Sequence, residues 1–124
     1  MYSYNSYHKI VVVVLVIFWA AFHFSQRTDE GLYYDNGQIK QTGGTKNALN
    51  EGVWTWFHPD GTVQLQGAFL SGNRDGVWKK YDKEGNLSSK STYLNNQLHG
   101  VYQEFDTEGN ITITKSYKKD VLQK

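Results

Sequence analysis

The sequence predicts an all-β fold, an antiparallel meander of tandem 24-residue β-hairpin repeats, preceded by one N-terminal apolar helix. Three observations support this prediction. Aromatic residues recur at intervals of 24, as in Trp54, Trp78 and Tyr102. Each copy places a glycine-closed turn between two segments rich in strand-forming residues. A continuous apolar run near the N-terminus is set apart from these copies.

The apolar run covers residues 10–24 and is interrupted only by His23. As a helix it would be roughly 22 Å long at about 1.5 Å per residue, which is short of the ~30 Å hydrocarbon core of a bilayer. Interfacial aromatic residues or local thinning could make up the difference. We predict a transmembrane anchor here. A cleaved signal peptide, whose apolar region is ordinarily of this length, and a buried segment of the globular part are the alternatives.

These features divide the chain into an N-terminal tail (1–9), the anchor or signal segment (10–24), a linker (25–30) and the hairpin repeats (31–124). The repeats comprise a degenerate copy (31–51) and three full copies (52–75, 76–99, 100–123). Because Lys9 precedes the apolar segment, we expect a single-pass membrane protein with its repeats on the extracytoplasmic side. Cleavage of the segment would make the protein secreted instead.

Besides the leading aromatic residue, six kinds of position recur in the three full copies. They are a glycine (Gly52, Gly76, Gly100), a valine (Val53, Val77, Val101), a first ring (Phe57, Tyr81, Phe105), a turn glycine (Gly61, Gly85, Gly109), an aliphatic residue (Val63, Leu87, Ile111) and a second ring (Phe69, Tyr93, Tyr117).

Turn chemistry converts each copy into a hairpin. Residues 58–61, 82–85 and 106–109 fit a type I turn closed by a left-handed glycine. The flanks then become strands, at 53–58 and 62–70 in the first full copy, and segments such as 71–75 and 95–99 make the reverse connections.

Alternation along a strand assigns the side chains to two faces. Val53 and Phe57 point one way, and Trp54 and Trp56 point the other. We expect the repeated valine, first-ring, aliphatic and second-ring positions, Phe69 among them, to form one continuous apolar stripe, opposite the row of Trp54, Trp78 and Tyr102.

The pattern Gly-Val-Trp-x-x-Tyr-x-x-x-Gly-x-Leu at 76–87, with Tyr93 downstream, resembles the bacterial variant of the MORN repeat. The resemblance covers about residues 31–119. It implies hairpins strung into an elongated sheet and a binding or scaffolding role, which for some such proteins is antitoxin-like.

Composition and motifs disfavour several functions. With 13 basic and 12 acidic side chains the chain has no strong field for nucleic acid, and without cysteine it has no thiolate chemistry. No nucleophile–base pair, phosphate loop or metal-ligand spacing occurs, so we predict no enzyme activity, catalytic residue, cofactor or metal. The tripeptide His58-Pro59-Asp60 is interpreted as turn chemistry.

The densest aromatic positions, Trp54, Trp56, Trp78 and Tyr102, are the candidate interaction surface, with ordinary sheet packing as the alternative explanation. We therefore predict a membrane-tethered, non-enzymatic module that binds a protein partner. An antitoxin-like role is one form that this function could take. The competing hypothesis is a cell-surface carbohydrate or cell-wall binding protein whose rings stack on sugars.

Overall fold

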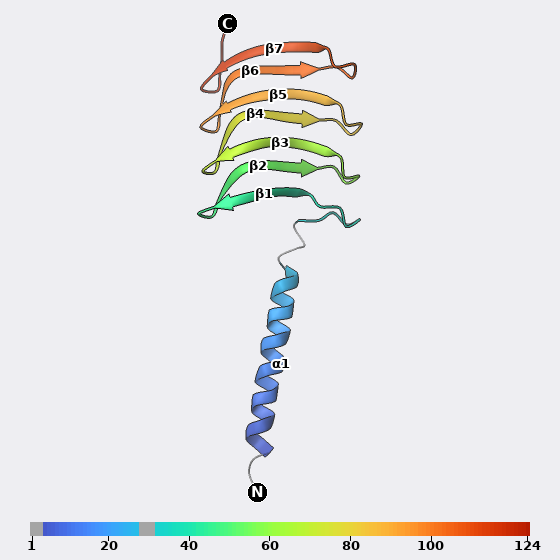
Figure 1. Ribbon diagram of the computed structural model, residues 1–124, viewed down its shortest axis with the longest axis vertical. Helices are drawn as coiled ribbons and strands as arrows, with labels where there is room; N and C mark the ends of the chain where they lie inside the picture. The colour runs from blue at the N-terminus through green and yellow to red at the C-terminus, as the bar shows by residue number, and fades with distance from the viewer. Residues whose placement is uncertain (1–3, 28–31) are drawn as a thin grey trace. The chain divides into compact units, whose positions relative to one another are not determined.

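The computed structural model describes residues 4–27 and 32–124, which fall into two units (Figure 1). The unit Met1–Tyr33 contains the helix α1 (Tyr4–Arg27), and the unit Tyr34–Lys124 contains one eight-stranded sheet. The strands are β1 (Gln41–Lys46), β2 (Leu49–Phe57), β3 (Val63–Leu70), β4 (Asn73–Tyr81), β5 (Leu87–Leu94), β6 (Gln97–Phe105), β7 (Ile111–Lys118) and β8 (Val121–Leu122).

Helix α1 confirms the predicted helix but not the predicted span. It extends beyond the apolar run into the predicted tail and linker, whose remaining residues, 1–3 and 28–30, lie outside the described part of the chain. Among the described residues, no helix is both long and apolar enough to cross a membrane. The short apolar run, roughly 22 Å as a helix, accounts for this correction.

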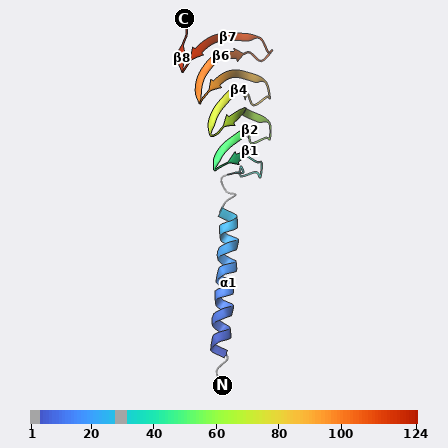
Figure 2. The same ribbon diagram turned by 60° about the vertical axis from the view of Figure 1, so that its left-hand side comes forward.

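The sheet is the predicted antiparallel meander. Its strands follow one another in chain order from β1 to β8, and each pairs with the next (Figure 1). Figure 2 shows that the strands are bent, so that the sheet curves rather than lying flat. Stability in such an array comes from contacts between successive hairpins, because a lone hairpin is marginal in water.

The glycine-closed turns form as predicted. Gly61, Gly85 and Gly109 have φ of +89°, +89° and +88°. In each turn the glycine N–H donates to the carbonyl three residues earlier, as from Gly61 to His58 at 2.9 Å. Gly37 repeats this geometry in the degenerate copy, so that copy keeps its turn although it lacks the tryptophan.

The reverse connections are tighter than the five-residue linkers expected from the sequence. Each is a two-residue turn with both residues at positive φ: Asn47–Ala48, Ser71–Gly72, Asn95–Asn96 and Lys119–Asp120. Such turns match the twist of paired strands. Consequently β2, β4 and β6 begin several residues earlier than predicted, and successive copies follow each other with almost no loop between them.

The predicted apolar stripe is wrong in one respect. Phe69 was placed with Val53, but its ring lies 6.1 Å from the Trp54 ring and 5.0 Å from the Trp78 ring, on the tryptophan side of the sheet. The reason is a shift in register beside the hairpin turn, where Phe57 pairs with Val63 although Trp56 pairs with Leu65. Simple alternation from one strand to the next fails across such a bulge.

Candidate functional site: the two faces of the sheet

Strand partners carry their side chains on the same side of the sheet, so the register defines two faces. The side that bears the repeated tryptophans is here called the tryptophan face, and the opposite side the valine face. The tryptophan face carries Trp54, Trp56, Leu65, Phe69, Trp78, Tyr93, Tyr102 and Tyr117, and the valine face carries Val53, Thr55, Gln66, Ala68, Val77, Lys79, Lys90, Val101 and Gln103.

Rings on the tryptophan face contact one another across the copies. Trp56 lies 5.9 Å from Trp54 and 5.7 Å from Trp78, measured between ring centroids. Trp78 meets Phe69 and Tyr93 edge to face at 5.0 and 6.1 Å. Trp78 is only 6 % exposed and is the one buried hydrophobic residue among those described. These rings therefore form the principal packing between the copies of the sheet.

Two tryptophans lie on glycines of the preceding strand. A Cβ atom at Gly43 would overlap the Trp54 ring, and one at Gly67 would overlap the Trp78 ring. Each indole N–H donates to the backbone carbonyl of the residue that follows the covered glycine. Trp54 donates to Gly44 at 2.9 Å, and Trp78 donates to Ala68 at 3.2 Å. We call each pair of a tryptophan and the glycine that it covers a cradle. Each cradle packs one copy against the previous copy.

The third junction lacks a cradle. Tyr102 takes the tryptophan position, and its strand partner is Ser91 where the earlier copies have glycine. The Tyr102 hydroxyl donates to Glu104 Oε1 at 2.7 Å, and its ring meets Tyr117 at 6.4 Å. The ring thus finds a carboxylate on its own strand instead of a backbone carbonyl on the neighbouring one.

Restoring the cradle at this junction should stabilise it. We expect Ser91→Gly and Tyr102→Trp together to be favourably coupled by about 1 kcal/mol or more, because the larger indole needs the space that Ser91 occupies. Each single change should be neutral or destabilising, since glycine weakens a strand and the indole alone meets the serine. A double-mutant cycle by urea unfolding measures the coupling, and strictly additive changes would contradict it.

The hydrogen bond to Glu104 raises the pKa of Tyr102 to about 12, with burial and the glutamate charge as further causes. Because the folded-state pKa lies above the unfolded value of about 10, the stabilisation is complete below pH ~10 and is lost as pH rises toward 12. We expect Glu104→Gln to lower the pKa of Tyr102. Tyrosinate absorbance, taken as the difference between each protein and its Tyr102→Phe variant, measures this, and Glu108→Gln, in the turn that follows β6, is the control.

Aspartates hold the glycine-closed turns at one margin of the sheet. Asp82 accepts from the backbone N–H of Asn86 at 2.8 Å, and Asp106 accepts likewise from Asn110. These bonds lower the pKa of both carboxyls, as the bonds from Thr62 lower that of Asp60. The contribution of these carboxylates to the stability of the folded protein is therefore present above the ordinary carboxyl pKa. It is lost as the pH falls through the lowered pKa values. The tripeptide 58–60 thus lies in a turn, as predicted.

The valine face is more open than the tryptophan face. Val53, Val77 and Val101 are 63, 50 and 48 % exposed, and recur once in each copy. Their strand partners are the small residues Ala68, Thr92 and Ser116. A shallow depression of about 250 Å³ joins two copies here, lined by Val53, Gln66, Gly67, Ala68, Val77 and Lys79.

A row of polar side chains runs beside these valines on the same face and crosses seven strands in register. We call it the polar row. Within it Gln66 Nε2 donates to Thr55 Oγ1 at 3.0 Å, and two lysines, Lys79 and Lys90, are direct strand partners. Its members in order are Thr42, Thr55, Gln66, Lys79, Lys90, Gln103 and Thr114.

The four residues proposed from the sequence as an interaction surface do share one face. Three of them, Trp54, Trp78 and Tyr102, are engaged in the inter-copy junctions described above. Trp56 is half-buried among other rings. The valine face was not singled out from the sequence, although the 24-residue recurrence of Val53, Val77 and Val101 was the signal that could have found it.

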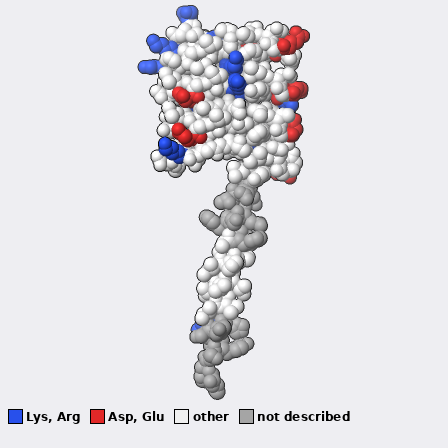
Figure 3. Space-filling model, in the orientation of Figure 1, with Lys and Arg blue, Asp and Glu red and all other residues white. Residues whose placement is uncertain are grey.

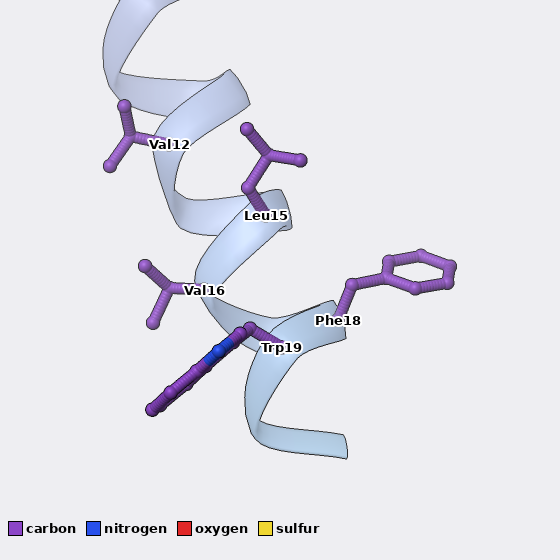
Figure 4. Close-up of a pocket in the computed structure, with 5 residues that line it drawn as sticks. All are labelled: Val12, Leu15, Val16, Phe18 and Trp19. Carbon is purple, nitrogen blue, oxygen red and sulfur yellow. The ribbon is translucent and has the colours of Figure 1, made fainter. Parts of the chain in front are cut away.

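The apolar run of α1 presents a second exposed surface. The side chains from Ile10 to Trp19 are all exposed within their unit. Val12, Leu15, Val16, Phe18 and Trp19 project from the helix, as Figure 4 shows, and line an apolar hollow between them. In the described parts of the chain, no group of His, Asp or Glu side chains could hold a metal ion.

The sequence model of the MORN repeat variant family matches this chain four times, at residues 32–47, 50–69, 74–95 and 98–119. The chain belongs to the MORN repeat variant family. The last three matches each begin within or just before β2, β4 or β6 and include one glycine-closed turn, so one MORN repeat corresponds to one hairpin. MORN repeats generally mediate interactions with proteins or membrane lipids. No curated protein matches the sequence.

Proposed function

We propose that this MORN-repeat protein is a non-enzymatic module that binds a protein partner on its valine face. One observation carries the proposal: Val53, Val77 and Val101 remain about half exposed or more, in a regular row across three copies. Exposed apolar side chains that recur in a row on one face of a sheet are typical of a protein-binding surface. The depression beside Val53 and Val77 offers a recess for a partner side chain.

The tryptophan face supports this role less well. Trp54 and Trp78 cover the glycines of their cradles, and both indole N–H groups are bonded to backbone carbonyls. The same engagement weighs against the carbohydrate hypothesis, because sugar binding by stacking requires an exposed ring face. Trp56 is half-buried and lies outside any cradle, whereas Trp78 is buried.

A capture experiment tests the proposal. We expect the full-length chain to recover a stoichiometric protein partner, and the triple variant Val53→Thr, Val77→Thr and Val101→Thr to lose it. Threonine keeps the β-branch that suits a strand, so the fold should persist while the apolar contact is removed. Ile113→Thr also replaces a β-branched aliphatic side chain by threonine, but on the tryptophan face, and is the control. Capture that is unaffected by the triple variant would refute docking on the valine face. An antitoxin-like role would be one form of protein binding and would be identified by the partner recovered.

The membrane location of the chain stays a prediction. The exposed apolar side chains of α1 support it, since so much apolar surface requires a cover. Fractionation of cells that express the chain with and without residues 1–26 tests it. We expect the complete chain in the membrane fraction and the shortened chain in the soluble fraction, and equal distributions would contradict it.

A further inference from the structure

The two lysines of the polar row form an arrangement that a sheet does not need for its own stability. Lys79 and Lys90 are direct strand partners at the centre of the valine face. Like charges placed opposite each other destabilise a strand pair. Within the described residues, no carboxylate forms an ion pair with either ammonium group. The Lys90 Nζ lies over the Phe105 ring, 5.4 Å from its centroid.

The neighbours of this pair along the polar row are uncharged hydrogen-bonding side chains. Gln66 is the strand partner of Lys79, and Gln103 is that of Lys90. Adjacent strands are about 4.8 Å apart, so the row of seven side chains is about 29 Å long. The exposed valines run alongside it. A ligand that follows the row thus meets apolar contacts on one side and two unpaired cations at the middle.

Several carboxylates lie toward the margins of the sheet. Asp82, Glu84, Asp106 and Glu108 lie in the glycine-closed turns at one margin, and Asp75, the strand partner of Ala68, lies toward the other. Figure 3 shows acidic side chains along the margin that holds these turns and basic side chains near the middle of the face in view. A wide anionic surface such as a membrane would meet the acidic side chains of the glycine-closed turns, whereas a narrow acidic ligand at the centre would avoid them.

From this arrangement we infer that the partner bound on the valine face presents an acidic, extended polypeptide segment. The segment lies along the polar row, with apolar side chains against Val53, Val77 and Val101 and carboxylates on Lys79 and Lys90. Charge complementarity at the pair then offsets the like-charge repulsion in the free sheet. The inference rests on the proposed function and specifies the chemistry of its partner.

The test uses the full chain and a labelled peptide of alternating valine and glutamate, with alternating valine and lysine as the control peptide. We expect the acidic peptide to bind by fluorescence anisotropy and the basic peptide not to bind. Affinity should fall as the salt concentration is raised, because exposed ion pairs are screened. The double variant Lys79→Gln and Lys90→Gln should weaken binding about tenfold. Lys80→Gln, one residue along but on the tryptophan face, is the matched control and should bind like the parent.

Folding is monitored in the same variants. Lys79→Gln relieves the like-charge pair without touching the contact between Lys90 and Phe105, so its Tm should equal or exceed that of the parent. Binding that is unchanged in the double variant would overturn the inference. So would tighter, lysine-dependent binding to phosphatidylserine-containing vesicles, which would assign the pair to a membrane surface. Loss of a dimer in the double variant by sedimentation would assign it to a second copy of this chain.

Failure of the inference is distinguishable from failure of the proposed function. If partner capture depends on the valines but not on Lys79 and Lys90, the proposed function stands and the acidic segment is refuted. If capture depends on neither set, docking on the valine face fails, and the inference fails with it.

Discussion

Gly67→Ala is expected to destabilise the sheet by about 3 kcal/mol. The added methyl group would overlap the ring of Trp78, which is buried at 6 % exposure. Overpacking of this kind costs about 1–3 kcal/mol, and a displaced indole also loses its hydrogen bond to the Ala68 carbonyl, worth about 1 kcal/mol. Against a typical total stability of about 5–15 kcal/mol, that loss is large.

Gly44→Ala is the matched control for this prediction. Gly44 also lies in a strand beside a cradle, but the nearest atom to its added Cβ would be the Glu51 carbonyl oxygen at 3.7 Å, an ordinary contact. Its substitution should be neutral or slightly stabilising, because alanine restricts the unfolded chain more than glycine does. Unfolding in guanidinium chloride, followed by tryptophan fluorescence, compares the two. Equal midpoints for both variants would show that the cradle does not constrain the glycine.

Much of the fold follows from local chemistry that the sequence displays. The turns at Gly61, Gly85 and Gly109 need a left-handed residue at a fixed place, and glycine marks that place in every copy. The period of 24 then fixes how the hairpins succeed one another. For these reasons the all-β meander and its glycine-closed turns could be predicted without reference to any contact between strands.

The reverse turns and the assignment of faces could not be predicted in the same way. The two-residue turns are Asn-Ala, Ser-Gly, Asn-Asn and Lys-Asp, so no shared residue marks them. The register shift beside the hairpin turn moves Phe69 to the tryptophan face, and such a bulge depends on the pairing of two strands rather than on either strand alone. Alternation therefore predicted Trp54 and Trp56 correctly within one strand and failed for Phe69 in the next.

The cradles were visible in the sequence as glycines inside strands, but reasoning from single strands did not predict them. Gly43 and Gly67 are 24 residues apart and lie inside strands, where glycine indicates a close approach of another group. Each precedes its tryptophan by the same interval, and where Tyr102 replaces tryptophan, Ser91 replaces glycine. That paired change is understandable only once the strands are aligned. The cradles account for the packing of Trp54 and Trp78, two of the four residues proposed as an interface.

The junctions between copies differ, and the one at Trp78 should contribute most to stability. We expect Trp78→Ala to lower the free energy of unfolding by about 3–5 kcal/mol, the usual range for removing a buried tryptophan. This single substitution removes the ring contacts to Trp56, Phe69 and Tyr93. It also removes the hydrogen bond to the Ala68 carbonyl. It also leaves Gly67 uncovered in the middle of the array, where the hairpins on either side depend on each other.

Tyr102→Ala at the equivalent position of the next copy is the comparison. Tyr102 is more exposed, has a ring contact with Tyr117 alone among the described residues and has no cradle, so we expect its loss to cost less than half as much. Because a repeat array unfolds from its weaker junctions, amide exchange in β6 and β7 of the parent protein should be faster than in β3 and β4. Equal costs for the two substitutions, together with uniform exchange across the sheet, would mean that the cradles contribute nothing beyond ordinary strand pairing.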